Sequence, residues 1–267
     1  MSKKLITACL GVLALAAFAL PANALAVSAT LTHPTGTALA PKFNGEKSKT
    51  CAEGGTCLTG TNIGNTFLKS DDGSATLSEC ATAVITGSLT KNANGHIEGD
   101  ITTATFFGEG AELNGMKECV GLAGLGNLTP TTNGTHPTCT GTPEQCPVEK
   151  IDNEDVANGT PWCLTAGGEL AANTFTVRGG TCSESARAIT FILDSTGAGE
   201  CKYTRSAAVT GTYTTDTTGD AILTIAPNAT STFTKEAGGV LCPTAGTLSM
   251  QFTLETDVTP ASPVWIS

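Results

Sequence analysis

From residue 27 onward, apolar and polar residues alternate in short runs with a period of two, which is typical of half-buried β-strands. No helical periodicity of useful length interrupts these runs. Threonine takes many of the polar positions and aliphatic side chains take the alternate ones, as expected when one face of a sheet packs on a core and the other faces water. The clearest expected strands are 83–90, 175–177, 188–193, 211–214, 221–225 and 248–254.

Turn residues separate the runs, and the fold class follows from this arrangement. Asp71-Asp72-Gly73, Asn94-Gly95, Gly179-Gly180 and Gly238-Gly239 are turn signals. Many short strands with threonine outside and aliphatic residues inside predict an all-β fold, an antiparallel β-sandwich. We expect one such domain over residues 27–267.

One segment departs from the alternating pattern. Residues 120–160 are rich in Gly, Thr, Pro and Asn and carry no alternating apolar positions. We expect a loop insertion in the sandwich there, because long loops of this kind are either functional or flexible. Two readings stay open: a variable surface that faces a partner, or a tolerated insertion without a role.

The first 26 residues have the features of a secretory signal peptide. A positive start at Lys3 and Lys4 precedes an apolar region from Leu10 to Leu20. Cleavage is expected before Leu25 or Val27. The apolar run is shorter than the roughly 20 residues of a membrane-spanning helix, so no membrane span is expected. The predicted location is outside the cell or at the cell surface.

Eleven cysteines occur in the chain, and the signal peptide contains Cys9. The ten that remain are an even number in an exported protein, which predicts a framework of five disulfides. These cysteines are Cys51, Cys57, Cys80, Cys119, Cys139, Cys146, Cys163, Cys182, Cys201 and Cys242.

The spacing ranks the pairings without fixing them, since ten cysteines allow about 945 combinations. Short loops favour Cys51 with Cys57 and Cys139 with Cys146. The remaining six are expected to pair in sequence order, as 80–119, 163–182 and 201–242. Zinc is the competing use of clustered cysteines, but no C-x-x-C spacing occurs and export favours oxidation.

The charge balance limits the partners. Without the signal peptide, basic residues fall from 14 to 12 against 24 acidic ones, which gives a net charge of −12. Such a charge repels nucleic acid and anionic lipid, so neither is expected as a partner. The same charge also keeps an exported protein soluble.

No catalytic set is recognisable. The three histidines, His33, His96 and His136, have loop-like surroundings. The sequence contains no G-x-S-x-G elbow, no H-E-x-x-H and no phosphate-binding glycine loop. We therefore expect no enzyme activity, no cofactor and no metal.

Acidic residues are the remaining candidates for chemistry. Two pairs of carboxylates each fall on one face of an expected strand: Glu98 with Asp100, and Glu255 with Asp257. Each pair is either a pair of glycosidase carboxylates or part of a solvated acidic face. The run 152–155 is either a calcium ligand set or an acidic turn, and it lacks the spacing of a dedicated calcium loop. Trp162, beside Cys163, is expected in the core, packed on a disulfide.

Five segments of the chain carry a resemblance to a known family: 177–182, 193–201, 211–216, 241–243 and 252–257. They resemble a family of uncharacterised exported proteins of high-GC soil bacteria. The resemblance covers most of the chain from about residue 30, and implies an exported β-rich domain without an assigned activity or functional residue. A fainter similarity is to exported activators of alkane oxidation.

These features predict a non-catalytic secreted or cell-surface protein with a structural or adhesive role. Self-association or attachment to the cell envelope would provide that role, because long threonine-rich strands can pair at their edges. The alternative is an extracellular binding module for an apolar or carbohydrate ligand, with residues 120–160 as its lip. A hydrolase acting through Glu98 or Asp100 is a third hypothesis.

Overall fold

The computed structural model describes residues 28–32, 34, 36, 38–39, 57–108, 112–113, 116–117, 119, 128–131, 161–195, 199–256 and 262–266. The expected signal peptide and most of the expected 120–160 insertion lie outside these residues. The described part is all-β, as predicted: it consists of antiparallel strands and one short 3-10 helix, η2 (Ala229–Ser231).

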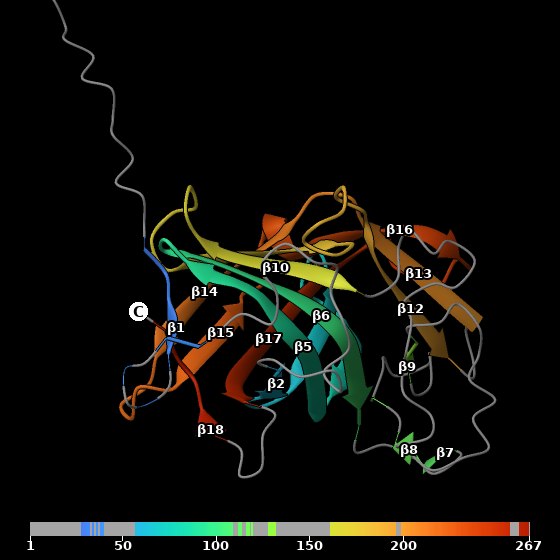
Figure 1. The fold of residues 1–267 in the computed structure, drawn as a ribbon. Coiled ribbons are helices and arrows are strands. Elements are labelled where there is room, and N and C mark those ends of the chain that lie inside the picture. The colour runs from blue at the N-terminus through green and yellow to red at the C-terminus, as the bar shows by residue number, and fades with distance from the viewer. Residues whose placement is uncertain are drawn as a thin grey trace, which may run out of the picture.

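Eight antiparallel strands close into a β-barrel (Figure 1). Closure depends on β17, which pairs with β2 along one side and with β15 along the other. The barrel strands are β2 (Cys57–Asn62), β5 (Thr82–Ala93), β6 (His96–Phe107), β10 (Trp162–Gly167), β11 (Thr174–Gly179), β14 (Val209–Thr215), β15 (Ala221–Ile225) and β17 (Ala245–Thr256).

The predicted β-sandwich is therefore wrong. A strand in a sandwich and a strand in a closed barrel both alternate between an apolar and a polar face, so the two-residue pattern is common to both folds. The difference lies in the pairing of β2 and β15 with β17. Residues of β2 pair with partners 190–198 residues further along the chain, and residues of β15 with partners 25–31 residues further along. Periodicity carries no information about such partners.

A second antiparallel sheet continues from the barrel through β17, which has 12 residues. Its first residues, Ala245–Ser249, pair with β16 and β3, whereas Met250–Thr256 pair with barrel strands. The strands that complete this second sheet are β3 (Thr66–Ser70), β4 (Thr76–Cys80), β9 (Leu128–Thr131), β12 (Ile189–Ser195), β13 (Gly199–Arg205) and β16 (Thr232–Gly238).

All of these extra strands are inserted at one end of the barrel. The barrel strands follow one another around the ring in chain order, so that β2, β6, β11 and β15 run in the same direction. The connections that leave the ends of these four strands contain β3 and β4, β7 to β9, β12 and β13, and β16. The second sheet therefore covers this end of the barrel, and the right-hand side of Figure 1 shows it.

Part of the expected 120–160 insertion belongs to this sheet. Residues 128–131 form β9, which pairs antiparallel with β12. For these four residues, the predicted loop is wrong, because they form a strand. The hairpin of β7 (Glu112–Leu113) and β8 (Met116–Lys117) precedes them.

Two segments close the opposite end of the barrel: a first segment that contains β1 (Leu31–Thr32), and a second segment that contains β18 (Ser262–Pro263) and β19 (Trp265–Ile266). β1 pairs with β19, and β18 pairs with the end of β17. The buried Asn92 side chain holds the first segment: its carbonyl accepts the Leu31 N–H at 3.0 Å, and its amide donates to the carbonyls of Leu31 and Leu39 at 2.7 and 2.9 Å.

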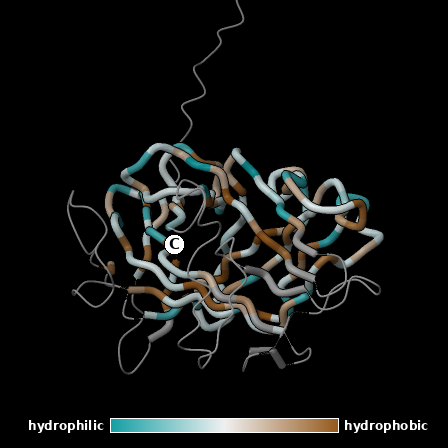
Figure 2. Tube along the Cα trace, turned by 90° about the vertical axis from the view of Figure 1, so that its right-hand side faces the viewer, coloured by the Kyte–Doolittle hydropathy of each residue, from teal (hydrophilic) through white to brown (hydrophobic). Residues whose placement is uncertain are grey.

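Alternating side chains fill the barrel between these two ends, and Figure 2 shows apolar and polar positions alternating along the strands. Glycine makes room for one of the aromatic side chains: a Cβ on Gly211 would overlap the Phe175 ring. At the junction with the second sheet, the Phe191 ring meets Phe106, Trp162 and Phe233 edge to face, with centroids 5.0–6.1 Å apart. This cluster joins the two sheets into one core.

Candidate functional site

Three disulfides lie within the described residues, and all three are the pairs expected from sequence order. They join Cys80 to Cys119, Cys163 to Cys182 and Cys201 to Cys242. Cys57 is also disulfide-bonded. The other predicted cysteines, Cys51, Cys139 and Cys146, lie outside the described residues.

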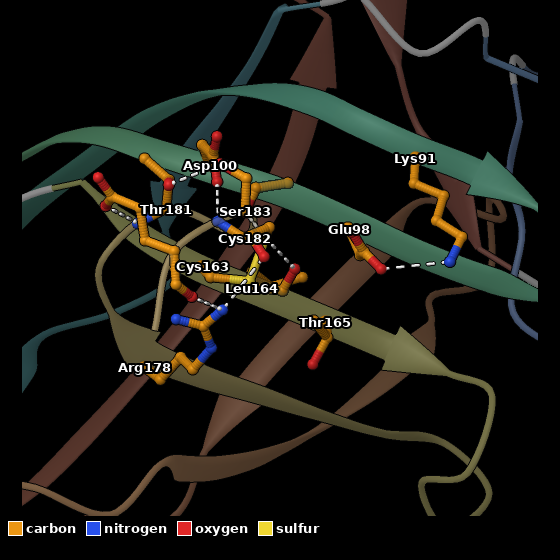
Figure 3. The surroundings of a disulfide bond; sticks show 12 residues. Lys91, Glu98, Asp100, Cys163, Leu164, Thr165, Arg178, Thr181, Cys182 and Ser183 are labelled. Carbon is orange, nitrogen blue, oxygen red and sulfur yellow. Dashed lines mark hydrogen bonds and ion pairs between the residues drawn. A yellow bond between two sulfur atoms is a disulfide. The ribbon is translucent and has the colours of Figure 1, made fainter. Parts of the chain in front are cut away.

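The Cys163–Cys182 disulfide ties a loop to the outer wall of the barrel (Figure 3). Trp162 and Leu164 line the interior, so Cys163 between them faces outward. Cys182 belongs to the connection between β11 and β12. A two-residue bridge between Gly179 and Arg187 closes the base of this loop.

This loop covers Asp100, one of the two carboxylates that the sequence places on one face of β6. Asp100 is 2% exposed, and its Oδ1 accepts the Cys182 N–H at 2.6 Å. Arg178 holds the loop from the other side, since its guanidinium donates to the carbonyls of Cys182 at 3.3 Å and Glu184 at 3.0 Å. Asp100 is thus a buried anchor for the loop, and neither a solvated acid nor a carboxylate open to substrate.

Glu98 lies on the same wall but has different neighbours. Its Oε1 is 3.3 Å from Lys91 Nζ and 3.3 Å from His96 Nε2. His96, expected in a loop, is the first residue of β6 and is half-buried. Beyond Glu98 the polar row continues with Thr165 and Thr176, whose hydroxyls hydrogen-bond at 2.7 Å. The two carboxylates of the pair therefore belong to separate hydrogen-bonded groups.

The other sequence candidates separate in space or lie outside the described residues. Glu255 is exposed on β17, while Asp257, His33, His136 and residues 152–155 are not described. Trp162 is in the core as expected, but it packs on Phe191. It cannot share a face with its neighbour Cys163, because adjacent strand residues point to opposite sides. Within the described parts of the chain, no cluster of His, Cys, Asp and Glu could hold a metal ion.

An exposed apolar loop tip is the surface feature that the sequence reasoning missed. Val240 is 100% exposed and Leu241 54% exposed, between β16 and β17. Apart from Ile63, they are the exposed large apolar side chains among the described residues. Their signal in the sequence is a pair of adjacent aliphatic residues that follows Gly238-Gly239 and breaks the alternation.

The chain holds this tip rigidly from behind. The Cys242 N–H donates to the Gly239 carbonyl at 3.1 Å, and the Cys201–Cys242 disulfide ties the turn to β13. Lys235 Nζ donates to the carbonyls of Gly239 at 3.4 Å and Cys242 at 3.0 Å. The buried Tyr203 hydroxyl donates to the Pro243 carbonyl at 3.1 Å. We call residues 239–242 the clamped tip.

Comparison of the chain with protein-family models, with curated proteins and with solved structures gives no match. The resemblance to exported proteins of soil bacteria therefore stays a prediction. Along the described stretches of the chain, no helix combines the length and the hydropathy that a membrane span requires.

Proposed function

We propose that this protein is a structural or adhesive component outside the cell, and that the clamped tip is its contact site. The observation that carries the proposal is the full exposure of Val240 on a turn fixed by a disulfide. An apolar side chain gains free energy when it leaves water, about 1.5–3 kcal/mol for a valine or leucine. A rigid tip keeps most of this gain, since little chain entropy is lost on contact.

The closed barrel changes the basis of the adhesive hypothesis. Strand edges were the expected contact, but a closed barrel has no edges. The described edges of the second sheet are β4 and β9, and these two strands lie near one another. Contact through an apolar tip needs no free edge.

The interior is a poor site for a sugar or another large ligand. Among the described residues, two cavities inside the barrel have volumes of about 40 and 50 Å³, and one under the second sheet has a volume of about 20 Å³. Sites for drug-sized ligands measure about 300–1,000 Å³. A large partner of this protein would therefore contact its outer surface, where the clamped tip lies.

The partner that we propose is an apolar surface of the cell envelope. The test measures attachment of purified protein to envelope fragments and to alkyl-coated beads. Wild-type protein should attach, and the double variant Val240→Ser, Leu241→Ser should attach at least tenfold more weakly, because both apolar contacts are lost. The matched control is Ile63→Ser. It removes an apolar side chain that is 40% exposed and lies in another turn.

Two results would overturn the proposal. One is wild-type protein that does not attach to either surface. The other is equal attachment by the double variant and by wild-type protein. Sedimentation of the same samples separates attachment from self-association: concentration-dependent dimers that the double variant abolishes would show that the tip contacts a second copy and not the envelope.

A further inference from the structure

The clamped tip is convex, and its shape limits the partners that can cover it. Val240 is 100% exposed and Leu241 is 54% exposed, and the other exposed large apolar side chain of the described residues, Ile63, belongs to another turn. Figure 1 shows that β16 leads to the tip on the side of the molecule away from β1. A stable protein–protein interface buries about 800 Å² on each partner, of which two side chains are a small part. A fluid apolar layer, by contrast, surrounds an inserted side chain on all sides.

The backbone around the tip is paired in a way that suits an apolar medium, where no water is present to pair N–H and C=O groups. The Gly239 carbonyl accepts the Cys242 N–H at 3.1 Å and Lys235 Nζ at 3.4 Å. The Cys242 carbonyl accepts Lys235 Nζ at 3.0 Å. The Pro243 carbonyl accepts the Tyr203 hydroxyl at 3.1 Å. Three carbonyls that flank the apolar pair thus have partners within the protein, which lowers the cost of taking this turn out of water.

The charges at the base of the tip suit a headgroup layer without net charge. Lys202 pairs with Glu236 at 3.3 Å in the strands that lead to the tip, and Lys235 lies under the turn. A lysine ammonium can stay at the level of polar headgroups while apolar groups beside it enter the layer beneath. The whole chain carries a formal net charge of −10, which opposes approach to an anionic surface.

We infer that the clamped tip inserts Val240 and Leu241 into the surface of a lipid bilayer with neutral headgroups. The inference rests on the proposed function, in which the same tip is the contact site, and it names the partner. Insertion involves the turn alone. Because membrane binding strength scales with the apolar area that is buried, two side chains give weak and reversible attachment, and single molecules exchange between the bilayer and water.

The first experiment is flotation of the purified, disulfide-bonded protein with phosphatidylcholine vesicles. Wild-type protein should float with the vesicles, and the double variant Val240→Ser, Leu241→Ser should partition roughly 30-fold less, because both apolar side chains are lost. Ile63→Ser is the matched control and should float like wild-type protein. Vesicles that contain phosphatidylglycerol should bind wild-type protein more weakly than the neutral vesicles do, because of the acidic charge of the chain.

A second experiment measures whether the tip enters the layer. Val240→Trp places an indole at the tip, and its added fluorescence should move to shorter wavelength when phosphatidylcholine vesicles are present. Lipids with bromine atoms on the acyl chains near the headgroup should quench this added emission. Wild-type protein is the control, since Trp162 and Trp265 lie outside the tip and their emission should not respond to the vesicles.

The outcomes separate this inference from the proposed function. Wild-type protein that attaches to envelope fragments or alkyl-coated beads but not to vesicles would overturn the lipid partner and leave the adhesive role standing. Attachment to fragments that protease treatment of the fragments abolishes would identify a protein as the partner instead. Attachment to no surface at all would overturn both. Equal flotation of the double variant, or preferential flotation with the anionic vesicles, would also contradict insertion of the tip.

Discussion

At the scale of single residues, the molecule depends on side chains whose neighbours come from distant parts of the chain. Phe191 belongs to the second sheet, yet its ring meets Trp162 of the barrel at 6.0 Å and Phe233 at 5.0 Å. The alternating pattern correctly predicts that these residues are buried. It gives no indication that they form one cluster, because ring contacts depend on strand pairing.

Replacement of Phe191 by alanine should lower the free energy of unfolding by about 3–5 kcal/mol, since a cavity remains where three aromatic contacts were. Urea denaturation followed by fluorescence measures the change. Phe67→Ala is the matched control, because Phe67 is half-buried and packs under Lys69 Nζ, 4.7 Å from its ring centroid. The control should lower the free energy of unfolding by less than half as much. Equal losses would show that Phe191 is not central to the core.

Asp72 is a second residue whose behaviour follows from its immediate neighbours. The Ser70 hydroxyl, at 2.6 Å, is the main cause that lowers its pKa to about 2, and the Ser74 N–H and hydroxyl add to the effect. Ser70→Ala should therefore raise the pKa of Asp72 toward its ordinary value of 3.8. NMR titration of the carboxyl carbon measures it, with Ser183→Ala as a control that leaves the pKa unchanged.

The lowered pKa of Asp72 also makes the stability of the fold depend on pH. The folded-state pKa lies below the unfolded one, so the hydrogen-bonded carboxylate stabilises the fold above pH 3.8. This contribution is lost as the pH falls from 3.8 to about 2. An unchanged Asp72 pKa in Ser70→Ala would contradict the assigned cause.

At the scale of elements, strands and turns were largely predictable and their partners were not. Residues 221–225 form β15 with the predicted bounds, and Asn94-Gly95 connects β5 to β6 with both residues at positive φ. Turn chemistry and alternation are local properties, which explains this agreement. The shared strand β17 has no local signal for its double role: a 12-residue alternating run is compatible with one sheet or two.

The disulfide-tied loop on the outer wall is an element whose attachment can be tested. Cys163→Ser with Cys182→Ser should lower the free energy of unfolding by about 2–4 kcal/mol, because the bridge closes a loop of 19 residues. Hydrogen exchange should also accelerate at the N–H of residue 182, which donates to Asp100 Oδ1 in the wild-type protein. Exchange in β13 and β16 should remain slow. Unchanged exchange at residue 182 would show that Asp100 and Arg178 hold the loop without the bridge.

At the scale of the whole molecule, the sequence predicted the composition of the core and the oxidised cysteines but not the closure of the sheet. Sequential pairing of the six cysteines between 80 and 242 was predictable because each bridge is shorter than about 45 residues. The barrel required the register of β17 on β2 and β15, which only long-range packing determines. The clamped tip was missed because exposure is a property of the folded surface.

The ionisation of the chain's two tyrosines at high pH tests whether the core stays closed. Burial raises the pKa of Tyr203 in β13 to about 12, and burial also raises the pKa of Tyr213 in β14. Both pKa shifts are upward from the ordinary 10.0, so the fold is favoured by neutral tyrosines. This stabilisation is complete below pH 10 and is lost as the pH rises toward 12.

Ultraviolet titration should therefore show less tyrosinate at pH 10 in native protein than in protein unfolded in urea, which should be half-ionised there. Circular dichroism on the same samples should show that the fold is lost in the range where the absorbance rises. Tyr203→Phe, which removes the hydroxyl that donates to the Pro243 carbonyl, should shift the alkaline unfolding midpoint upward, since Tyr213 then remains as the single ionising tyrosine. Native protein that is half-ionised at pH 10 with its fold intact would contradict the sealed interior from which this expectation follows.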